Sequence, residues 1–229
     1  MRVAIMQPTY LPWIGYFALI DLVDTFVFLD DVQFDRRSWQ QRNRVKGPNG
    51  EILLTVPVKK SPRDTLLNNI QIDYGHDFPR NHILNVEKNY ARSMHLNAFW
   101  KPIRALMESA THGLAELNVS IILHLVAQFG LKANFVRSSD LGIVGKRDEY
   151  LAKLCVEMGA TTYVSPPGSR AYLEGSEFFR KYRIGVEYLD FTHPTYRQEH
   201  GVFLSHLSVV DLLLNVGTES AAVIRSGLQ

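Results

Sequence analysis

Short apolar runs alternate with helical patterns along most of the chain. Residues 2–7 and 25–29 are apolar runs of strand length, and residues 13–22 between them carry apolar side chains at helical spacing. A strand, a helix and a strand within so short a span predict a right-handed βαβ unit with parallel strands. Further strands are predicted at residues 51–58, 69–73, 133–136, 161–164 and 186–190, and further helices at about 147–158, 175–182 and 207–225.

The middle of the chain has a helical pattern from about residue 77 to 129, in pieces near 78–92, 97–110 and 112–129. No repeat, low-complexity tract or linker interrupts the sequence. The sequence therefore predicts an α/β fold in which one domain spans residues 1–229. We expect a Rossmann-like, mostly parallel sheet flanked by helices, with a helical insertion at about 77–129.

The first predicted strand runs directly into an aromatic-rich turn that precedes a helix. In open α/β sheets ligands bind where the carboxyl ends of strands meet the amino ends of helices, because free backbone N–H groups there favour anions. The aromatic side chains of this turn outnumber what a turn requires, and they could form the lip of a pocket. The candidate ligand-binding residues of this elbow are Gln7, Tyr10, Trp13 and Tyr16.

Two carboxylates, Asp30 and Asp31, follow the second predicted strand and are expected at the same sheet edge as Gln7. Adjacent carboxylates could bind a divalent cation, or one of them could act as a catalytic base. The alternative is structural, with one carboxylate capping a helix or pairing with an arginine while the other is solvated. Both residues are catalytic candidates.

A basic segment with interleaved aromatic residues, 32–46, comes next and shows no clean helical or strand periodicity, so it is predicted as a loop or a short helix. Arginine offers a planar fork that suits phosphate or carboxylate groups, and the aromatic rings could stack on a base or a sugar. A solvated charged loop would explain the same residues. The substrate-binding candidates in this segment are Gln33, Arg37, Arg42, Asn43 and Lys46.

Two later segments add candidates. Ser165 and Tyr172 belong to a second strand-to-helix elbow, which lacks both the Walker pattern and the G-x-G-x-x-G fingerprint and could equally be a simple capped turn. Ser208, Asp211 and Asn215 share one face of an otherwise apolar helix, where buried polar groups form either a structural network or a pocket wall. His206 and Asp211 are catalytic candidates, and Ser208 and Asn215 are binding candidates.

Composition narrows the classes of partner. The formal charge of +2 is too small to favour a nucleic-acid partner. The single cysteine, Cys155, excludes an intramolecular disulfide, and the eight histidines have no ligand spacing, so no metal site built from cysteine or histidine is predicted. No apolar run is long enough to span a membrane, and cytoplasmic localisation is expected. The sequence identifies no cofactor and leaves homo-oligomer formation open.

Several segments together resemble the WbqC-like protein family, found among bacterial surface-polysaccharide and O-antigen gene clusters. The matching segments are residues 7–17, 28–34, 42–46, 54–58, 163–166 and 207–217. The chain has Ser165-Pro166 where the family usually has Ser-Gly, and Gln40-Gln41 where asparagine is often found. The resemblance implies a place in polysaccharide biosynthesis, and it transfers no residue roles.

A second likeness links the first elbow to nucleotidyltransferases that carry an H-x-G-H signature, although Trp13 and Tyr16 stand where the signature histidines would be. The resulting hypothesis is a transferase or ligase that acts on a nucleotide-linked or otherwise activated sugar in bacterial surface-polysaccharide synthesis, such as that of lipopolysaccharide. The alternatives are a non-catalytic binding or scaffold protein, and a nucleotidyltransferase-like enzyme that lacks the signature histidines.

Overall fold

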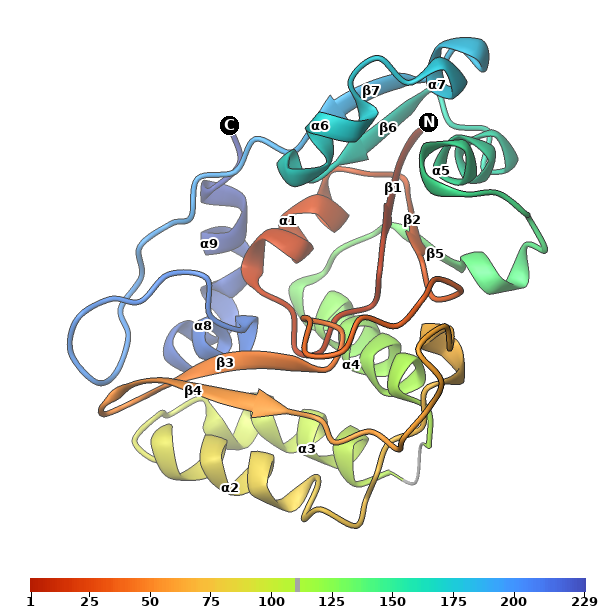
Figure 1. Ribbon diagram of the computed structural model, residues 1–229. Coiled ribbons are helices and arrows are strands. Elements are labelled where there is room, and N and C mark those ends of the chain that lie inside the picture. The colour runs from red at the N-terminus through yellow and green to blue at the C-terminus, as the bar shows by residue number, and fades with distance from the viewer. Residues whose placement is uncertain (110–111) are drawn as a thin grey trace.

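A parallel sheet forms the centre of the molecule, as the computed structural model of residues 1–109 and 112–229 shows (Figure 1). Within these residues its five strands have the order β5-β2-β1-β6-β7, and every neighbouring pair is parallel. This is the order 3-2-1-4-5 of the first five strands of a Rossmann sheet, so the predicted fold class is confirmed. The strands are β1 (Arg2–Met6), β2 (Thr25–Phe28), β5 (Asn134–Arg137), β6 (Thr162–Ser165) and β7 (Gly185–Tyr188).

Helices cover both faces of the sheet because alternate strand residues point to opposite sides. Ala4 and Phe26 pack into the larger core with α1, α4 and α8, whereas Val3 and Val27 pack into a smaller core with α5 and α7. The α-helices are α1 (Ile14–Asp21), α2 (Arg80–Asn89), α3 (Lys101–Glu108), α4 (Leu114–Phe129), α5 (Arg147–Glu157), α6 (Arg170–Leu173), α7 (Glu177–Lys181), α8 (Val209–Val216) and α9 (Ser220–Ser226).

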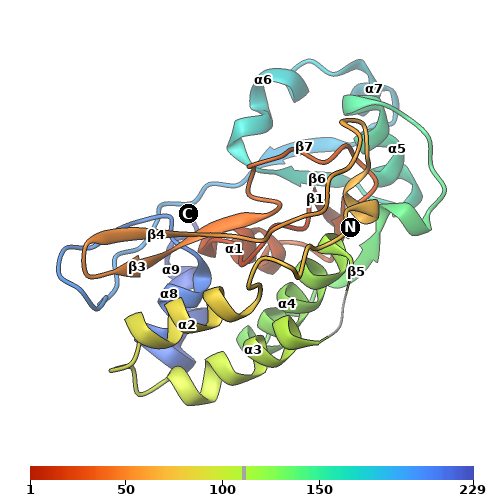
Figure 2. The same cartoon turned by 60° about the horizontal axis from the view of Figure 1, so that its bottom comes forward.

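The basic segment corrects one prediction, because residues 42–47 form a strand rather than a loop or a short helix. Strand β3 (Arg42–Gly47) pairs with β4 (Gly50–Thr55) in an antiparallel hairpin separate from the central sheet. Its basic residues lie at every second position and share one face, which hides the usual apolar alternation. Figure 2 shows this hairpin projecting over α2, with the chain between β7 and α8 beside its tip.

Two other predictions differ from the structure. Residues 69–73 are expected to form a strand, but they form only two isolated β-bridges, Val58 with Ile72 and Gln71 with Gly113. The helix expected at 97–110 begins as a π-helical turn at Leu96–Trp100 and continues as α3. Residue 110 of that prediction lies outside the described residues.

His82 on α2 ties the first elbow to the hairpin. Its Nε2 lies 3.2 Å from the Thr55 carbonyl oxygen and therefore donates, so Nδ1 accepts the 2.8 Å hydrogen bond from the Tyr10 hydroxyl. Burial lowers the pKa of His82 to about 4, although the Thr55 hydrogen bond opposes this shift. The imidazole is therefore neutral in the folded protein.

This neutral histidine predicts acid sensitivity of the fold. Between pH 6.5 and about 4 the unfolded chain protonates this imidazole and the folded chain does not, so stability falls as the pH is lowered. We expect a loss of about 2–3 kcal/mol by pH 4.5 that a His82→Leu variant does not show. Urea unfolding of both proteins at pH 7 and pH 4.5 measures the difference. Equal losses in the two proteins would contradict the assignment.

Candidate functional site

The strand order reverses between β1 and β6, and a cavity of about 290 Å³ lies at the carboxyl ends of these two strands. Such a switch point is where open α/β sheets bind ligands, because the connections leave in opposite directions and open a crevice. We call it the switch-point cavity. Its polar and exposed aromatic lining residues are Gln7, Thr9, Ser38, Trp39, Gln40, Ser165 and Tyr172.

The switch-point cavity has neutral polar chemistry, and none of the described residues that line it is charged. The Gln40 amide donates a 2.8 Å hydrogen bond to the Gln7 side-chain oxygen, which leaves the Gln7 NH2 group for a ligand. Trp39 and Tyr172 are 47% and 56% exposed. Amide groups beside exposed aromatic rings suit a hydroxyl-rich, weakly charged molecule.

A second cavity of about 270 Å³ adjoins the first and shares Met6, Thr9 and Trp39 with it. We call it the indole cavity. Its other lining residues are Trp13, Tyr16, Asn43, Arg44 and His206. The two cavities therefore meet at Trp39, so one elongated ligand, or two ligands, could occupy both.

Trp13 covers the first turn of α1. A Cβ atom at Gly15 would lie 2.2 Å from Cη2 of the Trp13 ring, so the indole packs directly against this glycine. The ring also stacks on His206 at 5.1 Å between centroids, with 23° between the planes. The first elbow therefore lines the indole cavity with the Trp13 side chain, whereas the sequence suggests open backbone N–H groups there.

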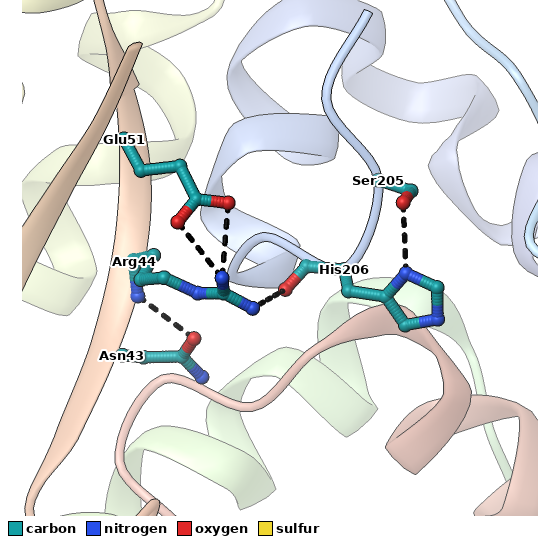
Figure 3. Close-up of polar contacts among 5 residues, drawn as sticks. All are labelled: Asn43, Arg44, Glu51, Ser205 and His206. Carbon is teal, nitrogen blue, oxygen red and sulfur yellow. Dashed lines mark hydrogen bonds and ion pairs between the residues drawn. The ribbon is translucent and has the colours of Figure 1, made fainter.

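Arg44 joins the hairpin to the chain that precedes α8 (Figure 3). Its Nη1 donates to both Glu51 carboxylate oxygens at 2.9 and 2.8 Å, and its Nη2 donates a long 3.4 Å bond to the His206 carbonyl. The Arg44 charge is therefore balanced by Glu51. The cation still lies on the wall of the indole cavity.

His206 is the lining residue best suited to proton transfer. Its side chain is exposed, and Nδ1 shares a 2.8 Å hydrogen bond with Ser205 Oγ. When Nδ1 donates in that bond, the Nε2 lone pair is left to accept a proton. The backbone at His206 has φ of 59°, a left-handed conformation that non-glycine residues rarely adopt and that often marks functional sites.

Asp30 and Asp31 lie further along the same sheet edge, outside both cavities. Asp30 is fully buried and accepts hydrogen bonds from the Ser139 N–H and hydroxyl at 3.1 and 3.0 Å. Asp31 accepts from the hydroxyls of Ser138 and Tyr150. Burial raises the pKa of the Tyr150 hydroxyl, and the hydrogen bond to Asp31 raises it further by a smaller amount. These carboxylates tie the end of β2 to the end of β5 and to α5.

Asp211 and Lys46 belong to a buried network behind the hairpin. Asp211 accepts from Tyr90, Tyr196 and Gln198 at 2.6, 2.8 and 2.7 Å. The Lys46 ammonium donates to the Gln198 side-chain oxygen at 3.1 Å and to the Val202 carbonyl at 2.6 Å. Burial raises the pKa of Asp211, while these hydrogen bonds and Lys46 oppose the rise. The network attaches the chain between β7 and α8 to the hairpin.

Other predicted residues hold the backbone. The Asn43 amide donates to the carbonyls of Tyr10 and Leu11 at 3.2 and 2.7 Å. Ser208 caps α8 by accepting from the Val210 N–H, and the Asn215 amide donates to the Asp211 carbonyl. Gln33 and Arg37 are exposed outside both cavities. The predicted residues that line one of these two cavities are Gln7, Trp13, Tyr16, Asn43, Ser165, Tyr172 and His206.

Sequence reasoning missed Thr9, Gln40 and Arg44 as site residues. It expects the rings of Phe34 and Trp39 to stack on a base or a sugar, without naming Trp39 as a site residue, and Arg44 follows Arg42 at strand spacing. Reading that segment as a strand would have placed Arg44 on the same face as Arg42. Thr9 and Gln40 carry no signal of their own.

Metal and thiol chemistry have no evident site in the described residues. Residues 1–109 and 112–229 contain no group of three or more His, Cys, Asp or Glu side chains placed to hold a metal ion. Cys155 is a core residue, and its burial raises the pKa of the thiol to about 12. In the same part of the chain no helix is long and apolar enough to cross a bilayer.

The fold and the cavities define an α/β protein with a Rossmann-like sheet and a candidate ligand cleft at its switch point. The chain belongs to the WbqC-like protein family, whose model matches residues 7–223. It is 34% identical over 233 residues to Rv1507c of Mycobacterium tuberculosis (strain ATCC 25618 / H37Rv), an uncharacterized protein, with 98% of this chain and 97% of that protein covered. No solved structure matches the chain.

Proposed function

We propose that the protein is a transferase or ligase that acts on a nucleotide-linked or otherwise activated sugar in bacterial surface-polysaccharide biosynthesis. The observation that carries the proposal is the junction of the two cavities at Trp39. The neutral switch-point cavity suits a sugar, and the indole cavity adds ring faces, a cation and an imidazole. The polysaccharide context comes from the family resemblance, and the cytoplasm is where we expect the reaction.

In the proposed reaction His206 Nε2 accepts the proton of an acceptor hydroxyl or amine. The acceptor atom bonds to the activated carbon of the sugar as the bond from that carbon to the phosphate oxygen breaks. The leaving phosphate keeps that electron pair, and Arg42 and Arg44 stabilise its charge. Positioning and electrostatic stabilisation therefore account for the catalysis.

Binding of nucleotide sugars tests the proposal directly. At least one member of a panel of nucleotide sugars, with and without magnesium, should raise the melting temperature of the protein. Replacing Tyr172 with alanine should remove most of that rise, because an exposed ring of the switch-point cavity is lost. Leu84→Ala, a control of similar exposure on α2, should leave it unchanged. A folded sample that no member stabilises would refute the proposal.

A non-catalytic binding or scaffold protein is the second candidate, and the buried networks around Asp30, Asp31 and Asp211 favour it because they leave few groups for chemistry. A His206→Gln variant separates the two. An enzyme should lose turnover and still bind ligand, whereas a scaffold should keep its effect on polysaccharide production. A nucleotidyltransferase-like reaction is less well supported, since Tyr16 is buried and its hydroxyl donates to the Gln7 carbonyl.

A further inference from the structure

Two arginines lie beneath a single exposed ring. Arg42 and Arg44 occupy alternate positions of β3, so their side chains leave the same face of the strand. Their guanidinium carbons lie 6.0 and 5.1 Å from the centre of the Trp39 ring. Trp39 is 47% exposed. It therefore covers the two cations while it remains partly open to solvent.

Both arginines carry a hydrogen-bond donor without an acceptor. The Nε atoms of Arg42 and Arg44 are buried and have no hydrogen-bond partner in the described residues. Buried donors of this kind are rare in folded proteins and call for an explanation such as an absent ligand. Within residues 1–109 and 112–229, Arg42 also has no ion pair, whereas Glu51 balances Arg44. The pair therefore combines one unbalanced positive charge with two unsatisfied donors.

The place of this pair in the cleft indicates what it would bind. Trp39 is the wall that the switch-point and indole cavities share, so a group that replaced the indole would lie between them. Same-face side chains on a strand start about 7 Å apart, a span that suits an extended anion better than a single small ion. Guanidinium groups bind phosphate oxygens in paired hydrogen bonds.

We propose that Trp39 is a displaceable cover over an anion site formed by Arg42 and Arg44, and that this site takes a diphosphate group. The proposal rests on the proposed function, because it makes this group the diphosphate of the nucleotide-linked substrate. The sugar would then lie in the switch-point cavity and the rest of the nucleotide in the indole cavity. The indole moves aside when the diphosphate enters.

Inorganic pyrophosphate is the probe, titrated by calorimetry at low salt into the wild type and into variants with unchanged melting temperatures. Trp39→Ala should bind pyrophosphate severalfold more tightly than the wild type, because no indole has to be displaced. Arg42→Gln should weaken binding roughly tenfold to a hundredfold. The control is Arg36→Gln, which removes an equal charge from an exposed arginine that stacks on Phe34 at 5.9 Å and should change the affinity less than twofold.

The direction of the Trp39→Ala effect decides the matter. If Trp39 is instead a platform on which ligands stack, its loss weakens binding or leaves it unchanged, and the cover is refuted. Equal losses in Arg42→Gln and Arg36→Gln, or no binding to any variant, refute the anion site. Pyrophosphate results as predicted without stabilisation by any nucleotide sugar would support this site and refute the proposed function. Nucleotide-sugar binding that does not depend on Arg42 would refute this site and support the proposed function.

Discussion

Replacing Asp211 with alanine is expected to lower the free energy of unfolding by about 3–5 kcal/mol. The substitution leaves the hydroxyls of Tyr90 and Tyr196 without their acceptor. It also removes one acceptor of the Gln198 amide, which keeps its hydrogen bond to the Leu204 carbonyl. It also leaves the buried Lys46 ammonium without the nearby carboxylate charge. For a chain of this size the melting temperature should fall by roughly 6–20 °C.

Chemical unfolding measures this loss of stability. Two further variants serve as comparisons. Asp211→Asn keeps one acceptor oxygen and should show a smaller loss than the alanine variant. Asp190→Ala removes an exposed carboxylate and should change stability by less than about 0.5 kcal/mol. A loss below about 1 kcal/mol for Asp211→Ala would show that the network contributes little to stability.

Gly15→Ala is expected to displace the Trp13 indole. The added methyl group would lie 2.2 Å from one ring carbon and 2.3 Å from another, closer than atoms can approach. Because the ring must move, its stacking on His206 is disrupted. We expect destabilisation of about 1–3 kcal/mol, as for other overpacked sites, together with loss of ligand-induced stabilisation.

The control is Gly113→Ala, at the amino end of α4, where the added methyl would lie 3.4 Å from Glu116 Cβ, at the edge of ordinary contact. It should leave stability and ligand response nearly unchanged. Thermal unfolding with and without the best nucleotide sugar measures both properties. If Gly15→Ala matches the control in both, the position of Trp13 is not essential to the indole cavity.

Much of the fold follows from local patterns. The unit from β1 through α1 to β2 can be predicted from the sequence, because apolar runs, a turn and helical spacing follow one another within residues 2–29. The hairpin strand β3 is not predicted as a strand, because its basic residues alternate with Asn43 and Val45 rather than with a regular series of apolar residues. Periodicity arguments rely on apolar residues, and they fail where a strand carries charges on one face.

The candidate site was less predictable because sequence order does not show which polar groups are already satisfied. Asp30 is a catalytic candidate at a strand end, and the sequence does not show that Ser139, 109 residues away, donates a hydrogen bond to it. Asp211 is a candidate for a pocket wall, and the sequence does not show that Tyr90, 121 residues away, donates a hydrogen bond to it. Aromatic residues at the first elbow were better guides, since Trp13 and Tyr16 do line the indole cavity.

The central claim is that the two cavities form one cleft for a nucleotide-linked sugar. A crystal structure of the protein with the nucleotide sugar that stabilises it most is the most direct measurement. The account predicts the sugar beside Gln7 and Tyr172, the diphosphate on Arg42 and Arg44, and the rest of the nucleotide against Trp13. A ligand bound elsewhere, or one that fills a single cavity without touching either arginine, would contradict it.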